Sequence, residues 1–106
     1  MPGIDYSGYE VAKKTYWQRQ MHIFTLPFYY IEYGMAQLGA VQVWANAINN
    51  QQAAVDAYKK ALALGSTVGL PKLFETAGAR FAFDADTLKI SVGLMEKTIA
   101  DLETKL

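Results

Sequence analysis

The stretch that decides the fold is residues 27–48, which read PFYYIEYGMAQLGAVQVWANAI. Pro27 suits the first turn of a helix, because an N–H there has no helical partner and the proline ring fixes φ near the helical value. The stretch carries one charge, Glu32, and its apolar residues extend almost all the way round a helix. A helix that is apolar on every side belongs at the centre of a core. We therefore predict a helix over 27–48 that the remaining chain is too short to bury completely.

The length and hydropathy of this stretch also raise the question of a membrane span. Polar residues recur through it, and Lys and Arg do not flank it as they flank spanning helices. We therefore expect no membrane-spanning segment and no membrane partner. The recurring polar residues are Glu32, Gln37, Gln42 and Asn46.

Helix signals on both sides of this stretch predict further helices. The spacing of apolar residues predicts a helix over 8–24, started by a capping box in which Ser7 and Glu10 satisfy free amides of the first turn. Asn50 ends the central helix and caps a helix over 51–64, because an Asn side chain accepts a hydrogen bond from a free amide of the first turn.

The last third of the chain contains a short helix and a long one. Pro71 opens the short helix, and residues 79–83 form an extended link that is too short to indicate a sheet. Asp84 caps a helix over 85–105 with the clearest amphipathic pattern in the chain. Its apolar residues repeat at alternating spacings of four and three: Leu88, Val92, Met95, Ile99, Leu102 and Leu106.

These signals predict an all-α fold of four to five mostly antiparallel helices, forming a single helical domain over residues 1–106. The core is predicted from the apolar faces of the helices. Its expected members are Trp17, Phe28, Ile31, Leu38, Val41, Trp44, Val55, Tyr58, Leu62, Leu73, Phe74, Leu88, Val92, Met95, Ile99 and Leu102.

The composition sets limits on function. Of the 106 residues 52% are hydrophobic and 19% charged, which excludes a disordered chain. Ten basic residues balance ten acidic ones, so we expect no nucleic-acid partner. The start, MPGIDYSGYE, lacks a basic region followed by an apolar core, so we expect a cytoplasmic protein. A short chain this apolar has more apolar surface than it can bury, and some of that surface is expected to contact a partner.

One run of residues is able to carry chemistry. It begins with His22, the only histidine, and continues through Pro27 to Tyr29, Tyr30 and Tyr33. Imidazole N–H and phenol O–H groups that converge on one point can bind a peptide carbonyl and the negative charge that develops on it. The alternative is that the tyrosines are half-buried core residues and His22 an ordinary helix-end residue. Spacing alone favours this alternative.

The rest of the sequence offers no catalytic machinery. It contains no phosphate-binding glycine loop, no nucleophile elbow and no paired-histidine zinc motif. Catalytic zinc needs about three protein ligands. One histidine and no cysteine do not provide them, so we expect no metal bound by this chain.

Residues 17–44, WQRQMHIFTLPFYYIEYGMAQLGAVQVW, resemble the C-terminal part of the catalytic domain of oligoendopeptidase F-type zinc peptidases, in the thimet-oligopeptidase superfamily. The flanking segments GIDYSGYE, AVDAYKKALALGST and LPKLFETAGARFAFD resemble the C-terminal helices of the same family. The similarity covers roughly residues 3–105.

The resemblance implies an antiparallel set of helices that forms one wall of a peptide channel. In the family a His-Glu-x-x-His helix and a further Glu hold the zinc, upstream of the segment seen here. A downstream His and several Tyr line the far side of the cleft and contact the substrate carbonyl. By resemblance His22, Tyr29, Tyr30 and Tyr33 are the substrate-binding residues, and the spacing leaves open which tyrosine faces the cleft.

Two functional hypotheses follow. The first is a truncated or separately encoded C-terminal fragment of a zinc-dependent oligoendopeptidase, inactive in isolation. Its partners are an upstream zinc-binding peptidase domain and, in the complete enzyme, zinc and a peptide substrate. The second is a stand-alone helical oligomerisation or peptide-binding module without catalysis. In either case we expect a homodimer through the helix over 27–48. There Gly34, Ala36, Gly39 and Ala40 permit close approach and Tyr29, Tyr33 or Trp44 act as anchors.

Overall fold

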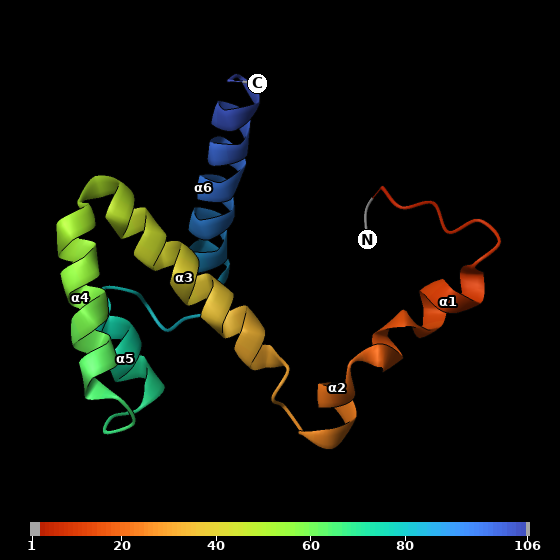
Figure 1. Ribbon diagram of the computed structural model, residues 1–106, viewed down its shortest axis with the longest axis horizontal. Helices are drawn as coiled ribbons and strands as arrows, with labels where there is room; N and C mark the ends of the chain where they lie inside the picture. The colour runs from red at the N-terminus through yellow and green to blue at the C-terminus, as the bar shows by residue number, and fades with distance from the viewer. Residues whose placement is uncertain (1–2, 106) are drawn as a thin grey trace. The chain divides into compact units, whose positions relative to one another are not determined.

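The computed structural model describes residues 3–105, which form helices and connecting segments and contain no strand. The predicted all-α fold is therefore confirmed. The chain divides into two compact units, Met1–Glu32 and Tyr33–Leu106. The helices, shown in Figure 1, are α1 Glu10–Thr15, the 3₁₀ helix Tyr16–Arg19, α2 Met21–Thr25, α3 Ile31–Asn49, α4 Gln51–Leu64, α5 Leu70–Thr76 and α6 Ala85–Glu103.

The first unit is not the single helix over 8–24 that the apolar spacing predicts. The α-helix ends at Thr15, where the side-chain hydroxyl donates to the carbonyl of Val11 at 2.8 Å. The chain tightens into a 3₁₀ turn and becomes non-helical at Gln20, where ψ is 89°. Thr and aromatic residues form helix poorly, because their side chains lose rotamer freedom against the preceding turn. That preference gives a physical reason for the break.

The predicted capping box at Ser7 is also wrong. The hydroxyl and N–H of Ser7 both donate to the carboxylate of Asp5, at 2.6 and 2.9 Å. These two hydrogen bonds hold the pKa of Asp5 below its ordinary value. The helix starts two residues later than a Ser7 cap requires, with Tyr9 at the N-cap and no side-chain cap. Hydrogen bonds from its own backbone N–H and from the N–H of Gly8 to the carboxylate of Glu10 lower the pKa of Glu10.

The central helix begins at Ile31 rather than at Pro27. A turn precedes it, in which the N–H of Tyr29 donates to the carbonyl of Leu26 at 3.1 Å. Proline at the second position and a positive φ of 63° at Phe28, the third, are the features of a type II turn. Pro27 is a sequence sign of a turn, but a bulky residue rarely adopts the backbone conformation of Phe28, so the sequence does not indicate the positive φ.

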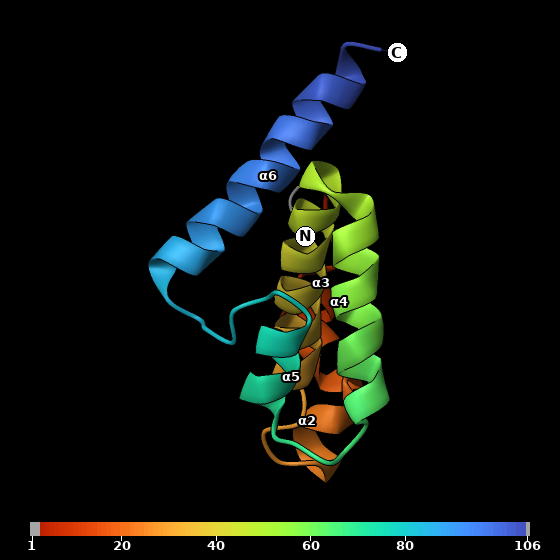
Figure 2. The same ribbon diagram turned by 90° about the vertical axis from the view of Figure 1, so that its left-hand side faces the viewer.

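In the second unit α3 and α4 form a hairpin. Figure 1 shows the hairpin opening away from its junction, and Figure 2 shows α5 packed beside α4. The junction is the predicted one, since the side chain of Asn50 accepts from the N–H of Ala53 at 3.0 Å. Gly65 follows α4 with a positive φ of 53°, which glycine adopts without strain.

Helix α3 has neighbours on two opposite sides, although its apolar residues Ile31, Trp44 and Ile48 remain exposed. One side faces α4 and α5, and there an added Cβ at Gly39 would lie 2.7 Å from the ring of Phe74. The other side faces α6, where Val41 and Ala45 of α3 and Leu94 of α6 line a common recess. Gly39 therefore permits the contact between α3 and α5.

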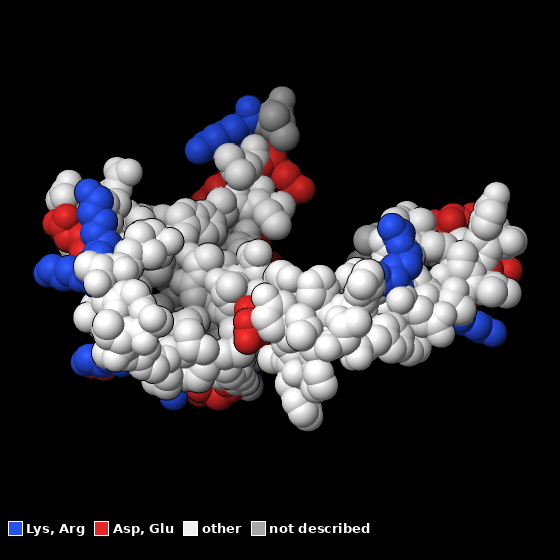
Figure 3. Space-filling view, turned by 60° about the horizontal axis from the view of Figure 1, so that its bottom comes forward, with Lys and Arg blue, Asp and Glu red and all other residues white. Residues whose placement is uncertain are grey.

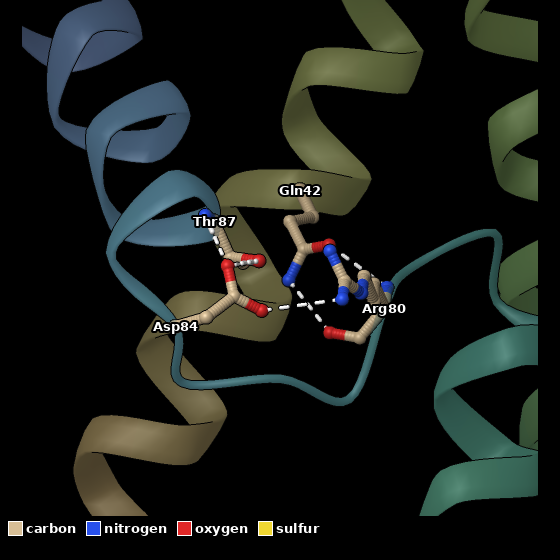
Figure 4. Close-up of polar contacts among 4 residues, drawn as sticks. All are labelled: Gln42, Arg80, Asp84 and Thr87. Carbon is tan, nitrogen blue, oxygen red and sulfur yellow. Dashed lines mark hydrogen bonds and ion pairs between the residues drawn. The ribbon is translucent and has the colours of Figure 1, made fainter.

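Helix α6 is tied to α3 through the link before it (Figure 4). The side-chain amide of Gln42 donates to the carbonyl of Arg80 at 3.0 Å and accepts from the N–H of Arg80 at 2.8 Å. Arg80 forms an ion pair with Asp84 at 3.2 Å. Asp84 accepts from the N–H and hydroxyl of Thr87, at 2.8 and 2.9 Å, which is the predicted cap. Gln42 was not predicted to have this role.

The buried residues differ from the predicted core. Leu38 is buried as predicted, and the other buried hydrophobic residues are small: Ala54, Ala61 and Ala79. Val41, Leu73 and Phe74 are half-buried. The remaining predicted core residues are exposed, because the helices pack through their small side chains: Trp17, Phe28, Ile31, Trp44, Val55, Tyr58, Leu62, Leu88, Val92, Met95, Ile99 and Leu102.

The face drawn in Figure 3 carries no concentration of charge of either sign. On the face in Figure 3 most atoms belong to uncharged residues, and Lys, Arg, Asp and Glu are scattered. None of the helices in residues 3–105 combines the length and apolar character that crossing a membrane requires.

Candidate functional site

Three of the four predicted site residues lie together in the first unit. His22, on α2, is half-buried. Its ring stacks on that of Tyr29, with centroids 5.7 Å apart and planes 15° from parallel. The ring of Tyr30 lies 6.3 Å from the imidazole at a tilt of 34°. The structure therefore brings one imidazole and two phenol rings into a single cluster, which we call the His/Tyr cluster.

The turn after α2 builds this cluster. Helix α2 ends where the N–H of Leu26 donates to the carbonyl of His22 at 3.4 Å. The turn at Pro27 and Phe28 then reverses the chain, so that Tyr29 and Tyr30 lie against His22. Phe28 has a positive φ of 63° and is 94% exposed, so packing of its side chain does not offset the backbone strain. Strained backbone of this kind is often found at binding sites.

Tyr33 is placed differently from the other tyrosines. It lies in the first turns of α3, in the second unit, and its side chain is exposed. The expectation that Tyr29, Tyr30 and Tyr33 share the start of one helix is wrong, because α3 begins at Ile31. Tyr29 and Tyr30 belong to the preceding turn. Their role in binding substrate stays a prediction.

The first unit contains further aromatic contacts outside the His/Tyr cluster. The rings of Trp17 and Phe24 stack with centroids 5.7 Å apart. The guanidinium of Arg19 lies 5.0 Å from the ring centroid of Tyr16, a cation–π distance. Trp17 was expected in the core; it is instead half-exposed beside Phe24. In the sequence, the only indication of this pair is that Trp17 and Phe24 are seven residues apart, which is two turns of a helix.

The chain's residues do not fit a zinc site. The sequence has one histidine and no cysteine. Within residues 3–105 no three His, Cys, Asp or Glu side chains gather in a way that can hold a metal ion. Zinc in catalytic sites takes about three protein ligands. The chemistry available in the His/Tyr cluster is therefore hydrogen-bond donation and aromatic contact.

The second unit contains an apolar pocket that sequence reasoning missed. Its volume is about 590 Å³, and it lies between α3, α4 and α5. Small residues of α3 and α4 leave the space, and three aromatic rings border it: Trp44, Tyr58 and Phe74. The apolar positions were visible in the sequence, but they were assigned to a filled core.

Comparison with known proteins places the chain. The model of a family described as Peptidase family M3 matches residues 4–92, most of the sequence and all four predicted site residues. The chain belongs to peptidase family M3. Membership in M3 confirms the predicted resemblance to the thimet-oligopeptidase group, while the oligoendopeptidase F type stays a prediction. No curated protein and no solved structure matches the chain.

Proposed function

We propose that this chain supplies part of the peptide-binding wall of an M3 peptidase of the oligoendopeptidase F type, with His22, Tyr29, Tyr30 and Tyr33 as the residues that bind the substrate. The observation that carries the proposal is the His/Tyr cluster, whose residues lie within the match to Peptidase family M3. The stacking of Tyr29 on His22 at 5.7 Å favours a preformed site over two independent side chains.

The chemistry proposed for these residues is binding and orientation. An imidazole N–H and a phenol O–H are donors of the kind that bind a peptide carbonyl oxygen. Such donors contribute most when negative charge develops on that oxygen during hydrolysis. His22 is half-buried and Tyr29 and Tyr30 are exposed, so a peptide can reach the phenol groups.

The zinc ion is held by another part of the peptidase in this proposal. Zinc supplies an activated water in enzymes of this kind. The residues present here do not fit a zinc site, so hydrolysis depends on a zinc-binding part of an M3 peptidase. We propose that this part is a partner of the chain, in the same polypeptide or in a separate one.

A pairing experiment tests the proposal. The chain is co-expressed with an M3 polypeptide that carries the His-Glu-x-x-His helix and lacks the segment matching residues 4–92, and hydrolysis of a fluorogenic oligopeptide is measured. We expect hydrolysis from the pair and none from either component with added zinc. We expect Tyr29→Phe and Tyr30→Phe to lower kcat/KM, because each change removes a hydroxyl group that we propose to contact the peptide.

The matched control is Tyr9→Phe, because Tyr9 is an exposed tyrosine of the same unit outside the cluster. It should leave kcat/KM of the pair unchanged. Hydrolysis by the isolated chain contradicts the proposal. So does an active pair whose kcat/KM is unaffected by each of His22→Ala, Tyr29→Phe, Tyr30→Phe and Tyr33→Phe.

A further inference from the structure

The chain exposes more surface than a folded chain of its size. A compact protein of 11.8 kDa exposes roughly 5,900 Å². Treating the two units as separate bodies raises that expectation to roughly 7,000 Å². The chain exposes 8511 Å². On either basis the surplus exceeds the ~800 Å² per partner that a standard interface buries.

One part of the exposed apolar surface lies on one face of α6. Its five apolar residues at spacings of four and three form what we call the α6 stripe. All five are exposed, from 38% at Met95 to 56% at Ile99. The side of α6 turned toward α3 is mixed in character: Thr87 and Ser91 are each 5% exposed, and the apolar residues Ile90 and Leu94 line the recess shared with α3. The α6 stripe consists of Leu88, Val92, Met95, Ile99 and Leu102.

A spacing of alternating four and three residues is that of a helix that pairs with another helix. The stripe also extends past the family match, which ends at Val92 and leaves Met95, Ile99 and Leu102 outside it.

The charges beside the stripe indicate the partner. Lys89, Glu96 and Glu103 lie seven residues apart along the edge of the stripe that is away from α3. All three are exposed, and none forms an ion pair within residues 3–105. Antiparallel pairing with a second α6 puts this edge against the same edge of the other helix. Lys89 of one copy then faces an acidic residue of the other, Glu96 or Glu103 according to the register.

A parallel pair lacks this complementarity, because the residues opposite the charged edge are then Ser91 and Thr98. We propose that two copies of this chain associate through antiparallel pairing of their α6 stripes. The two-fold arrangement makes each Lys–Glu pair occur twice.

This interface differs from the one expected on the central helix. In that expected interface Gly39 permits close approach of the helix from a second copy. In the structure the ring of Phe74 from α5 already lies against Gly39. Association through α3 is thus an alternative that the same experiment distinguishes.

Sedimentation equilibrium of the full chain tests the proposal, with variants on and off the stripe. At tens of micromolar we expect a dimer. Ile99→Lys should weaken association at least tenfold, because it puts a charge into the apolar contact. The matched control is Ile90→Lys, the same change on the same helix at a residue that is 71% exposed and outside the stripe. It should leave the dimer intact. Circular dichroism verifies that both variants keep their helices.

Charge exchange tests the identity and direction of the partner helix. Lys89→Glu should weaken the dimer about tenfold, because two attractive pairs become repulsive. Adding Glu96→Lys or Glu103→Lys should restore it, and the one that does so reports the register. A single species of 11.8 kDa overturns the proposal. A dimer unaffected by Ile99→Lys, or one that neither second change restores, overturns it as well.

Discussion

Gly34 and Gly39 lie five residues apart in α3 and differ in what surrounds them. No atom lies within 4 Å of a Cβ built on Gly34, whereas a Cβ on Gly39 meets the ring of Phe74 at 2.7 Å. The close contact between α3 and α5 therefore depends on Gly39 and not on Gly34.

We predict opposite effects of alanine at these two positions. Gly34→Ala should stabilise the chain by up to about 1 kcal/mol, because alanine is the better helix former. Gly39→Ala gains the same preference but forces the Phe74 ring aside, at a cost of about 1–3 kcal/mol. Urea unfolding of the two variants measures the difference. Equal stabilisation by both changes would show that the Phe74 contact is not tight.

Phe28 provides a second test at the residue scale. Its φ of 63° is unfavourable for a bulky side chain, and its ring is almost fully exposed. We expect Phe28→Gly to stabilise the chain by up to about 1 kcal/mol, because glycine adopts this φ without strain. Phe28→Ala keeps a Cβ and serves as the control, with little change expected. Thermal unfolding separates the two, and a loss of stability confined to Phe28→Gly would contradict the strain argument.

At the scale of the helix, Asp84 makes the start of α6 sensitive to pH. The N–H and hydroxyl of Thr87 hydrogen-bond its carboxylate and hold the pKa below the ordinary value of 3.8. A carboxyl whose pKa is lowered on folding stabilises the fold at pH above the unfolded value. That contribution is lost as the pH falls through the lowered pKa.

We therefore predict that stability falls with pH more steeply for the natural chain than for Asp84→Asn, which keeps an acceptor oxygen without a titrating charge. Urea unfolding at about pH 6 and about pH 2 measures this difference. Identical pH dependence in the two proteins would exclude a contribution from the cap.

The helices differ in how well the sequence predicts them. The starts of α4 and α6 were predictable because Asn50 and Asp84 provide explicit caps. The break between α1 and α2 was not, because apolar spacing continues through residues whose backbone leaves the helix at Gln20. Periodicity also identified the α6 stripe without showing what covers it, and the side of α6 that faces α3 combines buried Thr87 and Ser91 with the apolar residues Ile90 and Leu94.

The candidate site was predictable in its residues but not in its geometry. His22, Tyr29 and Tyr30 were identified as a group, and their rings do lie together. The turn that joins them depends on a positive φ at Phe28, which no residue-type preference indicates. The sequence motif and the family resemblance identified the candidate residues. The backbone conformation of the turn determines how their rings lie against each other.

For the whole molecule, the ligand inventory predicts how the isolated chain responds to zinc. One histidine and no cysteine fall short of the ligands that a tight site needs. We expect calorimetry to show no zinc bound at one per chain with submicromolar affinity. Saturation at one zinc per chain in that range would contradict this prediction and would show that the chain itself binds the metal.

The central claim is that this chain provides substrate-binding groups to an M3 peptidase. The most direct measurement is kcat for an oligopeptide in the paired enzyme, comparing the natural chain with His22→Ala. We predict that kcat falls about 100- to 1,000-fold, the usual loss when one donor to a developing oxyanion is removed, with a smaller change in KM. An unchanged kcat in a correctly folded His22→Ala pair would contradict the account.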